Sequence, residues 1–205
     1  MNQTSEDDDF EEMDLTQTSE SAERVKQVVT ASVLAALSIA VAPVASVVPR
    51  IPVWGIAIFD PVSIFWIISF LLGGFTVGLL STIAGTLGLF LYDPTAIGPV
   101  FKLLATLPMI VVPWFGVRRL NSDVGGGSLS KARFYGMLMI AAFILRLAIM
   151  VPVNLAYGAI AYPFFTIDFI LSYAIILNGF QSLWDALIPF IIVHRTDVFR
   201  VFKMW

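Results

Sequence analysis

The sequence predicts an all-α polytopic membrane protein with six transmembrane helices and both termini in the cytoplasm. Of its 205 residues, 58% are hydrophobic and 13% are charged, which is about half the charged share of an average soluble domain. The mean hydropathy is +0.87. Several uncharged runs approach the roughly 20 residues that cross a bilayer as one helix. These runs are continuously apolar rather than alternating, so transmembrane strands are not expected.

The two ends of the chain differ from this membrane part. Residues 1–27 carry nine acidic and two basic side chains, a composition typical of a disordered tail, here a cytoplasmic one. They lack the basic start and apolar stretch of a secretory signal. Residues 28–195 form the predicted membrane domain, and residues 196–205 a short cytoplasmic tail.

The first predicted helix covers residues 28–48. Ala31 and Ala35 are four residues apart, as are Ala36 and Ala40. Small residues at this spacing allow a second helix to approach closely. That second helix can belong to a partner protein or to the same chain, and the spacing alone favours packing within the same chain, because alanine is common.

Residues 49–61 contain prolines and a glycine among many apolar side chains. Prolines argue against a regular helix, and so many apolar residues would be poorly placed in a solvated loop. We expect a structured loop that folds back over the protein. The alternative is a loop in the headgroup region, anchored there by Trp54.

Residues 62–91 contain no charge. One straight helix of this length would measure about 45 Å, too long for a hydrocarbon core of about 30 Å. The pair Gly73-Gly74 divides the run into two shorter helices, at residues 62–73 and 75–91. A re-entrant hairpin that does not fully cross the bilayer is the alternative.

Three further helices are predicted at residues 100–117, 134–155 and 170–193. With six segments, nine of the 12 basic residues fall on the cytoplasmic side. This agrees with the preference of lysine and arginine for cytoplasmic loops. A hairpin at residues 62–91 would give the same orientation.

Lys102 is a lone cation just inside the fourth predicted helix. A lysine at the bilayer centre costs about 2.5–3.5 kcal/mol on insertion scales, so it usually faces a cavity or a partner. Asp93-Pro94 and Gly98-Pro99 interrupt the chain just before it. Lys102 is therefore predicted to line a pocket open to one side of the membrane, unless it extends to the headgroups.

The last two helices carry polar residues on one face each. Arg146 and Asn154 are eight residues apart, which puts them on one face of the first of these helices. Asn178, Gln181 and Asp185, at spacings of three and four residues, share one face of the second. Arg146 and Asp185 are expected to form a structural ion pair, because an unpaired buried charge is costly. The amides can bond between helices or hold a ligand.

We expect Lys102, Asn154 and Asn178 to converge beneath three aromatic loops on the outer side. Amides, a cation and stacking rings suit a flat, polar small molecule. The predicted substrate-binding set adds Trp54, Phe59, Tyr92, Tyr157 and Gln181.

The sequence lacks the residues that several classes of protein function require. The chain has no cysteine and one histidine, so neither thiolate chemistry nor a histidine metal site is expected. No nucleophile–base pair, phosphate loop or nucleotide motif is present. We therefore expect no enzyme, metal, cofactor or nucleic-acid partner, and any energy must come from a partner protein.

The chain resembles the substrate-binding S components of energy-coupling factor (ECF) vitamin transporters, and most of all the riboflavin type. The resemblance covers residues 28–195. It is carried by the order of the segments ASVLAALSIA, FDPVSIFWIISFLLGGFTVGLL, GPVFKLLATLP, RLAIMVPVNLAYGAIAYP and ILNGFQSLWDALIPFIIVHR.

The resemblance implies a multi-pass protein of the cell membrane that captures a vitamin, riboflavin in the first instance, from outside. It implies that Ala31 and Ala35 contact a transmembrane coupling subunit and that two cytoplasmic ATPases drive release. It also implies that Lys102, Asn154 and Asn178 contact the flavin and that residues 49–61 cover it. The alternatives are another vitamin, a structural or assembly membrane protein, and an intramembrane enzyme.

Overall fold

A computed structural model describes residues 4–51, 56, 57, 59–120, 126–196, 204 and 205. Within them the chain forms five α-helices, one two-stranded β-ribbon, a 3-10 helix and a π-helical turn. The elements are α1 (Thr4–Val47), β1 (Arg50–Ile51), β2 (Ile56–Ala57), α2 (Val62–Leu89), α3 (Ile97–Leu120), η1 (Gly126–Ser130), α4 (Ala132–Ala161), α5 (Ile167–Phe190) and η2 (Ile191–Arg195).

The five α-helices each contain a segment long and apolar enough to cross a membrane. These segments are Glu20–Val44, Val62–Leu89, Ile97–Leu120, Ala132–Ala161 and Ile167–Arg195. Most residues of α2 are buried inside the protein, whereas most of those in α1, α4 and α5 face outward. The fold is therefore an all-helical bundle built around α2, compatible with insertion in a membrane.

Gly74 interrupts α2, with φ of 76° and ψ of −167°. This backbone conformation is open essentially to glycine alone. The predicted division of residues 62–91 at Gly73-Gly74 thus coincides with the observed break. The two helices on either side of the break share the label α2, and we describe them as its first arm (62–73) and its second arm (75–89).

The two arms fold back on each other. A methyl group at Gly78 would lie 2.6 Å from the Cβ of Phe70, and one at Gly85 would lie 2.2 Å from the indole nitrogen of Trp66. A straight helix would hold Trp66 and Gly85 about 28 Å apart. The 62–91 stretch is therefore a helical hairpin, and its glycines lie where the arms touch.

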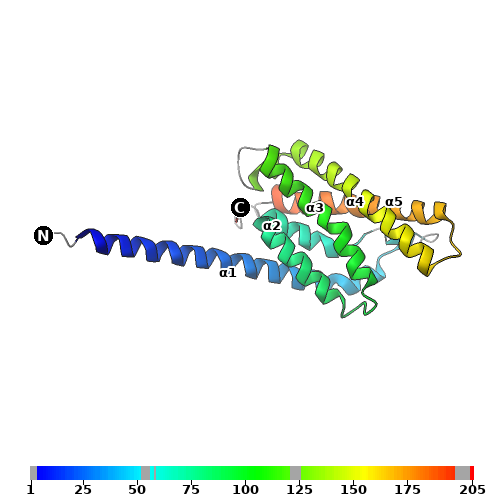
Figure 1. Ribbon diagram of the computed structural model, residues 1–205, viewed down its shortest axis with the longest axis horizontal. Helices are drawn as coiled ribbons and strands as arrows, with labels where there is room; N and C mark the ends of the chain where they lie inside the picture. Colours follow the sequence, from blue (N-terminus) through cyan, green and yellow to red (C-terminus); the bar gives the residue numbers. More distant parts are fainter. Residues whose placement is uncertain (1–3, 52–55, 58, 121–125, 197–203) are drawn as a thin grey trace.

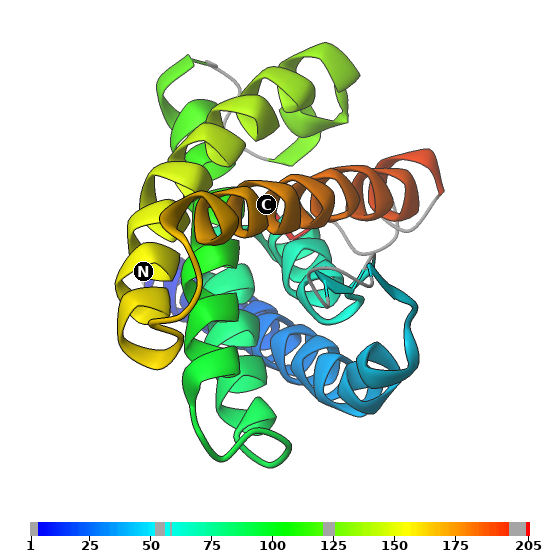
Figure 2. The same cartoon turned by 90° about the vertical axis from the view of Figure 1, so that its right-hand side faces the viewer.

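The bundle has two distinct ends (Figure 1). We call the end with residues 48–51, 56, 57, 59–61, 90–96 and 162–166 the loop end, and the end with residues 126–131, 204 and 205 the tail end. Figure 2 looks onto the loop end, where α5 (orange) crosses α3 (green), and α1 (blue) lies below α5 in this view.

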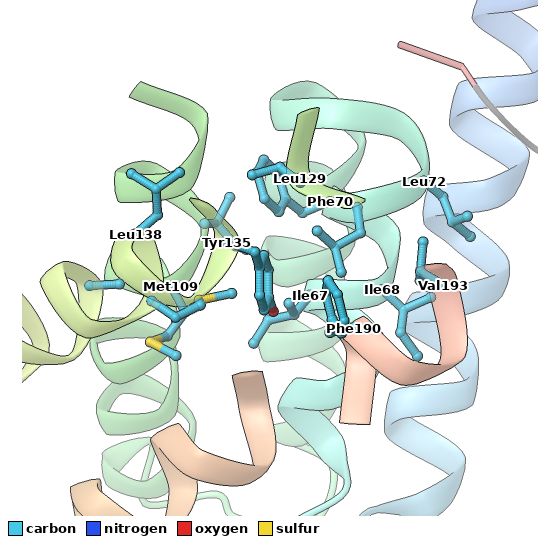
Figure 3. Packing of buried hydrophobic residues seen from close by; sticks show 14 of the residues in the cluster. Ile67, Ile68, Phe70, Leu72, Met109, Leu129, Tyr135, Leu138, Phe190 and Val193 are labelled. Carbon is cyan, nitrogen blue, oxygen red and sulfur yellow. The ribbon is translucent and has the colours of Figure 1, made fainter. Parts of the chain in front are cut away.

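The apolar core lies toward the tail end, between α2, α3, α4 and the last turns of α5 (Figure 3). Tyr135 and Phe190 stack there with ring centres 4.9 Å apart. The Tyr135 hydroxyl donates to the Ala186 carbonyl at 2.9 Å, which satisfies its polar end. Along α4 this apolar core reaches Ala142, and Arg146 follows one turn closer to the loop end.

The acidic N-terminal segment, expected to be disordered, is helical from Thr4 onward. It continues α1 and projects away from the bundle (Figure 1). Extending an existing helix avoids the cost of nucleation, which accounts for the difference. Glu20 and Arg24 add an exposed ion pair of 3.6 Å.

The last two residues are docked on the bundle, although residues 196–205 were expected to form a free tail. The Met204 amide donates to the Leu72 carbonyl at 3.2 Å, and the Trp205 indole donates to the Leu71 carbonyl at 3.2 Å. These carbonyls lie in the last turn of the first arm of α2, just before the break at Gly74. The tail thus caps the broken helix. Residues 197–203 lie outside the described part of the chain.

Candidate functional site

Arg146 is the centre of a buried polar cluster, with only 1% of its side chain exposed. Its Nη1 atom lies 2.8 Å from Oδ2 of Asp185, which is the pairing expected from the sequence. Its Nε atom donates to Oδ1 of Asn178 at 2.8 Å. The guanidinium group of Arg146 on α4 therefore bonds to two residues that lie about two turns apart on α5.

Two more side chains complete this cluster. The Nη2 atom of Arg146 donates to Oε1 of Gln181 at 2.7 Å. Ser63, in the first turn of α2, donates its hydroxyl to Oδ1 of Asp185 at 2.6 Å. Three helices thus share the cluster. Hydrogen bonds at each of these positions offset the large cost of removing two charges from water.

A second ion pair lies at the loop end. The ammonium group of Lys102, on α3, contacts Oδ2 of Asp60 in the loop before α2. The two side chains are only 18% and 14% exposed. The other oxygen of Asp60 accepts a hydrogen bond from the Val62 amide at 3.1 Å. Asp60 therefore ties the loop both to α3 and to the start of α2.

The charges of the two pairs influence each other. Burial alone would raise the pKa of Asp60, but Lys102, the Val62 amide and the more distant Arg146 together hold that pKa below its ordinary value of 3.8. Lys102 also lies within electrostatic range of Asp185. The site is thus one group of two cations and two carboxylates, and Asp60 is ionised at neutral pH.

The loop before α2 spans the gap between α3 and α5. Phe59 packs edge-on against Trp184 of α5, with ring centres 6.1 Å apart, while the next residue, Asp60, binds α3. The loop also contains the β-ribbon, in which Arg50 is opposite Ala57. This arrangement agrees with the expected structured loop. Trp54 lies outside the described residues.

The three side chains expected to converge have different partners. Lys102 binds Asp60, Asn178 binds Arg146, and the Asn154 amide donates to the Met150 carbonyl of its own helix at 2.7 Å. Asn178 also donates to the Ala174 carbonyl at 2.7 Å. The structure therefore brings Lys102 and Asn178 into one electrostatic group through Asp60, Arg146 and Asp185, while Asn154 stands beside it.

The aromatic residues of the predicted lid fall into separate groups. Tyr157 packs against Phe101 of α3 at 5.3 Å and against Tyr162 at 5.9 Å. Tyr92 is 55% exposed. A further aromatic cluster follows α4 and consists of exposed Tyr162, Phe164 and Phe165 and half-buried Phe169.

Two residues of the site, Asp60 and Ser63, were not among the predicted ones. Asp60 had a detectable signal, because it is the carboxylate just before the uncharged run 62–91, and a buried lysine needs a counter-charge. No sequence signal singled out Ser63, because serine is common at the start of a helix.

Ala31 and Ala35 do not form the outward surface predicted for a partner. They are 4% and 3% exposed and lie on the side of α1 that packs against α2. Ser38, on the same side, accepts a hydrogen bond from the Trp66 indole at 2.8 Å. Their small size serves packing within the chain.

No protein family, curated protein or solved structure that was compared with this chain matches it.

Proposed function

We propose that this chain is a substrate-capture subunit of a membrane importer, which binds a small polar molecule at the loop end. The observation that carries the proposal is the Lys102–Asp60 pair. It joins a loop to a membrane helix and lies within electrostatic range of the buried polar cluster around Arg146. An importer needs such a site, accessible from one side and closed by a segment that can move.

The site offers hydrogen-bonding groups to a ligand once the loop moves. Separating Asp60 from Lys102 would free a carboxylate and an ammonium group, and Oδ1 of Asn154 can still accept a hydrogen bond. Tyr157 and Phe59 supply flat rings nearby. Riboflavin combines a flat ring system, a polar edge of carbonyl and N–H groups and a hydroxylated chain, so it matches this set. Gln181 and Asn178 then support the site by holding Arg146.

The remaining parts of the proposal follow from the resemblance to ECF S components. The two arms of α2 count as two of six membrane segments, the tail end faces the cytoplasm and the loop end faces outward, across the cell membrane. A coupling subunit and two ATPases supply the energy, and the chain itself catalyses no reaction.

We place the surface for the coupling subunit one residue further along α1 than the predicted pair, Ala31 and Ala35. Ser32, Ala36 and Ala40 are exposed, four residues apart on α1. They repeat the small-residue spacing of Ala31 and Ala35 on the outward side, where a partner helix can approach.

One observation favours a second function. Arg146, Asp185, Asn178 and Gln181 bind one another, as expected if the cluster only holds helices together. In that case the chain is a structural or assembly protein of the membrane without a ligand.

Titration of riboflavin with the purified full-length protein tests the proposal, because bound flavin usually loses fluorescence on stacking with aromatic rings. We expect saturable quenching in the wild type and at least about tenfold weaker binding for Lys102→Met, which loses a charge-assisted contact. Arg119→Gln, an exposed substitution at the tail end, is the matched control and should bind as the wild type does.

Mass spectrometry of small molecules retained by the purified protein separates the alternatives. A different retained vitamin, without flavin binding, would replace riboflavin and keep the function. If no small molecule is retained and Lys102→Met leaves uptake by cells unchanged, the structural alternative holds.

A further inference from the structure

A pocket of about 330 Å³ opens at the tail end, far from the site described above. It lies between α1, α2, α3 and the docked residue Trp205. Its polar lining consists of Gln27, Thr76 and Arg118. Its apolar lining includes Phe75, Trp114 and Trp205. One cation and two hydrogen-bonding groups thus face a wall of aromatic rings.

The cation of this pocket is held in place by stacking. The guanidinium carbon of Arg118 lies 5.1 Å from the centre of the Trp114 ring, and Trp114 stacks on Phe75 with ring centres 4.4 Å apart. None of the ion pairs formed among the described residues includes Arg118. Its planar N–H groups therefore remain available, and their geometry matches the oxygens of a phosphate group.

The aromatic wall is preformed. Trp205 packs against Phe70 with ring centres 5.4 Å apart and donates to the Leu71 carbonyl. A side chain at Gly74 or Gly126 would collide with its ring, at 2.9 Å and 2.7 Å. The indole ring of Trp205 therefore fits only because Gly74 and Gly126 have no side chains.

From these features we infer that the pocket binds the headgroup of an anionic phospholipid, with the phosphate on Arg118 and the adjoining glycerol and acyl carbons against the rings. Arg118 lies in the last turn of α3, where a membrane-spanning helix reaches the headgroup layer. Lys131 and Arg133 also lie near this end and favour anionic lipids over zwitterionic ones. A free phosphate ion shares the contact to Arg118 but leaves the aromatic wall unused.

Quenching of tryptophan fluorescence by brominated lipids tests this inference, because Trp114 and Trp205 line the pocket. Full-length protein in detergent is titrated with dibrominated phosphatidylglycerol and with dibrominated phosphatidylcholine. We expect saturable quenching by the first and at least about tenfold weaker binding of the second, because its choline cation offsets the phosphate charge that attracts Arg118 and the neighbouring basic residues. Trp114→Phe should remove a large part of the quenching.

Arg118→Gln and Arg119→Gln form a matched pair. Both arginines are exposed and stack on an aromatic ring of α3, since Arg119 lies 5.3 Å from the centre of the Phe115 ring, but only Arg118 lines the pocket. We expect Arg118→Gln to reduce the affinity for phosphatidylglycerol to that for phosphatidylcholine, and Arg119→Gln to leave it unchanged. Equal losses in both variants would show attraction by surface charge alone and overturn the site.

Competition in the wild type gives a readout that needs no variant. Unlabelled phosphatidylglycerol should displace the brominated lipid, whereas phosphatidylcholine and millimolar sodium phosphate should not. Displacement by sodium phosphate would identify a free anion as the ligand and overturn the lipid assignment. Equal quenching by the two brominated lipids would also overturn it.

Discussion

Arg146 and Asp185 show, at the scale of single residues, how charges are accommodated in an apolar bundle. Each is almost completely buried, and together they use an amide of Asn178, an amide of Gln181 and the hydroxyl of Ser63. A buried pair of this kind contributes little net stability, but losing one partner leaves an uncompensated charge. The cluster therefore fixes how α2, α4 and α5 lie relative to one another.

We predict that Arg146→Met destabilises the protein by roughly 3–5 kcal/mol, because Asp185 is left buried without its counter-charge. Replacing both residues, as Arg146→Met with Asp185→Leu, should recover much of the loss. Denaturant unfolding in detergent measures both variants. If the two substitutions destabilise additively, the residues do not act as a pair.

A second residue-scale prediction concerns the pH dependence of the Asp60–Lys102 contact. The pKa of Asp60 is lower in the folded protein than its ordinary value of 3.8. A lowered carboxyl pKa stabilises the fold above the unfolded value, and this contribution disappears as the pH falls below it.

The unfolding midpoints of the wild type and of Asp60→Asn should therefore differ by a constant amount from about pH 5 to pH 8 and converge below about pH 4. Thermal unfolding over this pH range provides the measurement. A difference that grows as the pH falls would contradict the assigned direction of the shift.

At the scale of elements, Gly74 turns one apolar run into the hairpin at the centre of the bundle. Its conformation, the contact of the two arms and the docking of Trp205 meet at this residue. Met204 and Trp205 donate hydrogen bonds to carbonyls in the last turn before the break. A local backbone feature thus sets both the hairpin and the position of the tail.

Gly74→Ala should destabilise the protein by at least about 1–3 kcal/mol, the usual cost of a strained backbone conformation. The added methyl group would also lie 2.9 Å from the Trp205 ring. Gly179→Ala in α5 is the matched control, because nothing lies within 4 Å of its added methyl group.

We expect Gly179→Ala to be neutral or slightly stabilising, since alanine favours a helix over glycine. Thermal unfolding of the two variants and the wild type tests the pair. Equal effects of the two substitutions would show that the break at Gly74 imposes no special conformation.

At the scale of the whole molecule, the hairpin determines which segments share an end. Because α2 returns at Gly74, residues 48–51, 56, 57, 59–61 and 90–96 lie together at the loop end, whereas residues 126–131 lie at the tail end (Figure 1). The proposed orientation places the loop end outside the cell.

The absence of cysteine from the sequence allows a direct test of this orientation. Thr95→Cys, at the loop end, should react with a membrane-impermeant maleimide in intact cells. Ser130→Cys, at the tail end, should react only after the membrane is permeabilised. Both positions are exposed. The reverse pattern would show that the chain is inserted the other way round.

Much of the helical architecture could be predicted because its signals are local. Uncharged runs of sufficient length mark the helices, and the pair Gly73-Gly74 marks the break in α2. The Arg146–Asp185 contact could also be predicted, since each is the charged residue on the polar face of its own predicted helix. The substrate, the partners and the direction of insertion stay predictions.

The sequence by itself determined the helices, the broken run and the need of each buried charge for a partner, because hydrophobicity and backbone preference act over a few neighbouring residues. Only the tertiary structure decided which partners meet. Asp60 reaches Lys102 across 42 positions because the loop folds between α3 and α5. Ala31 and Ala35 turn inward because α1 packs against α2. These outcomes depend on helix rotation and loop path, which are set by packing over the whole bundle rather than by any one segment.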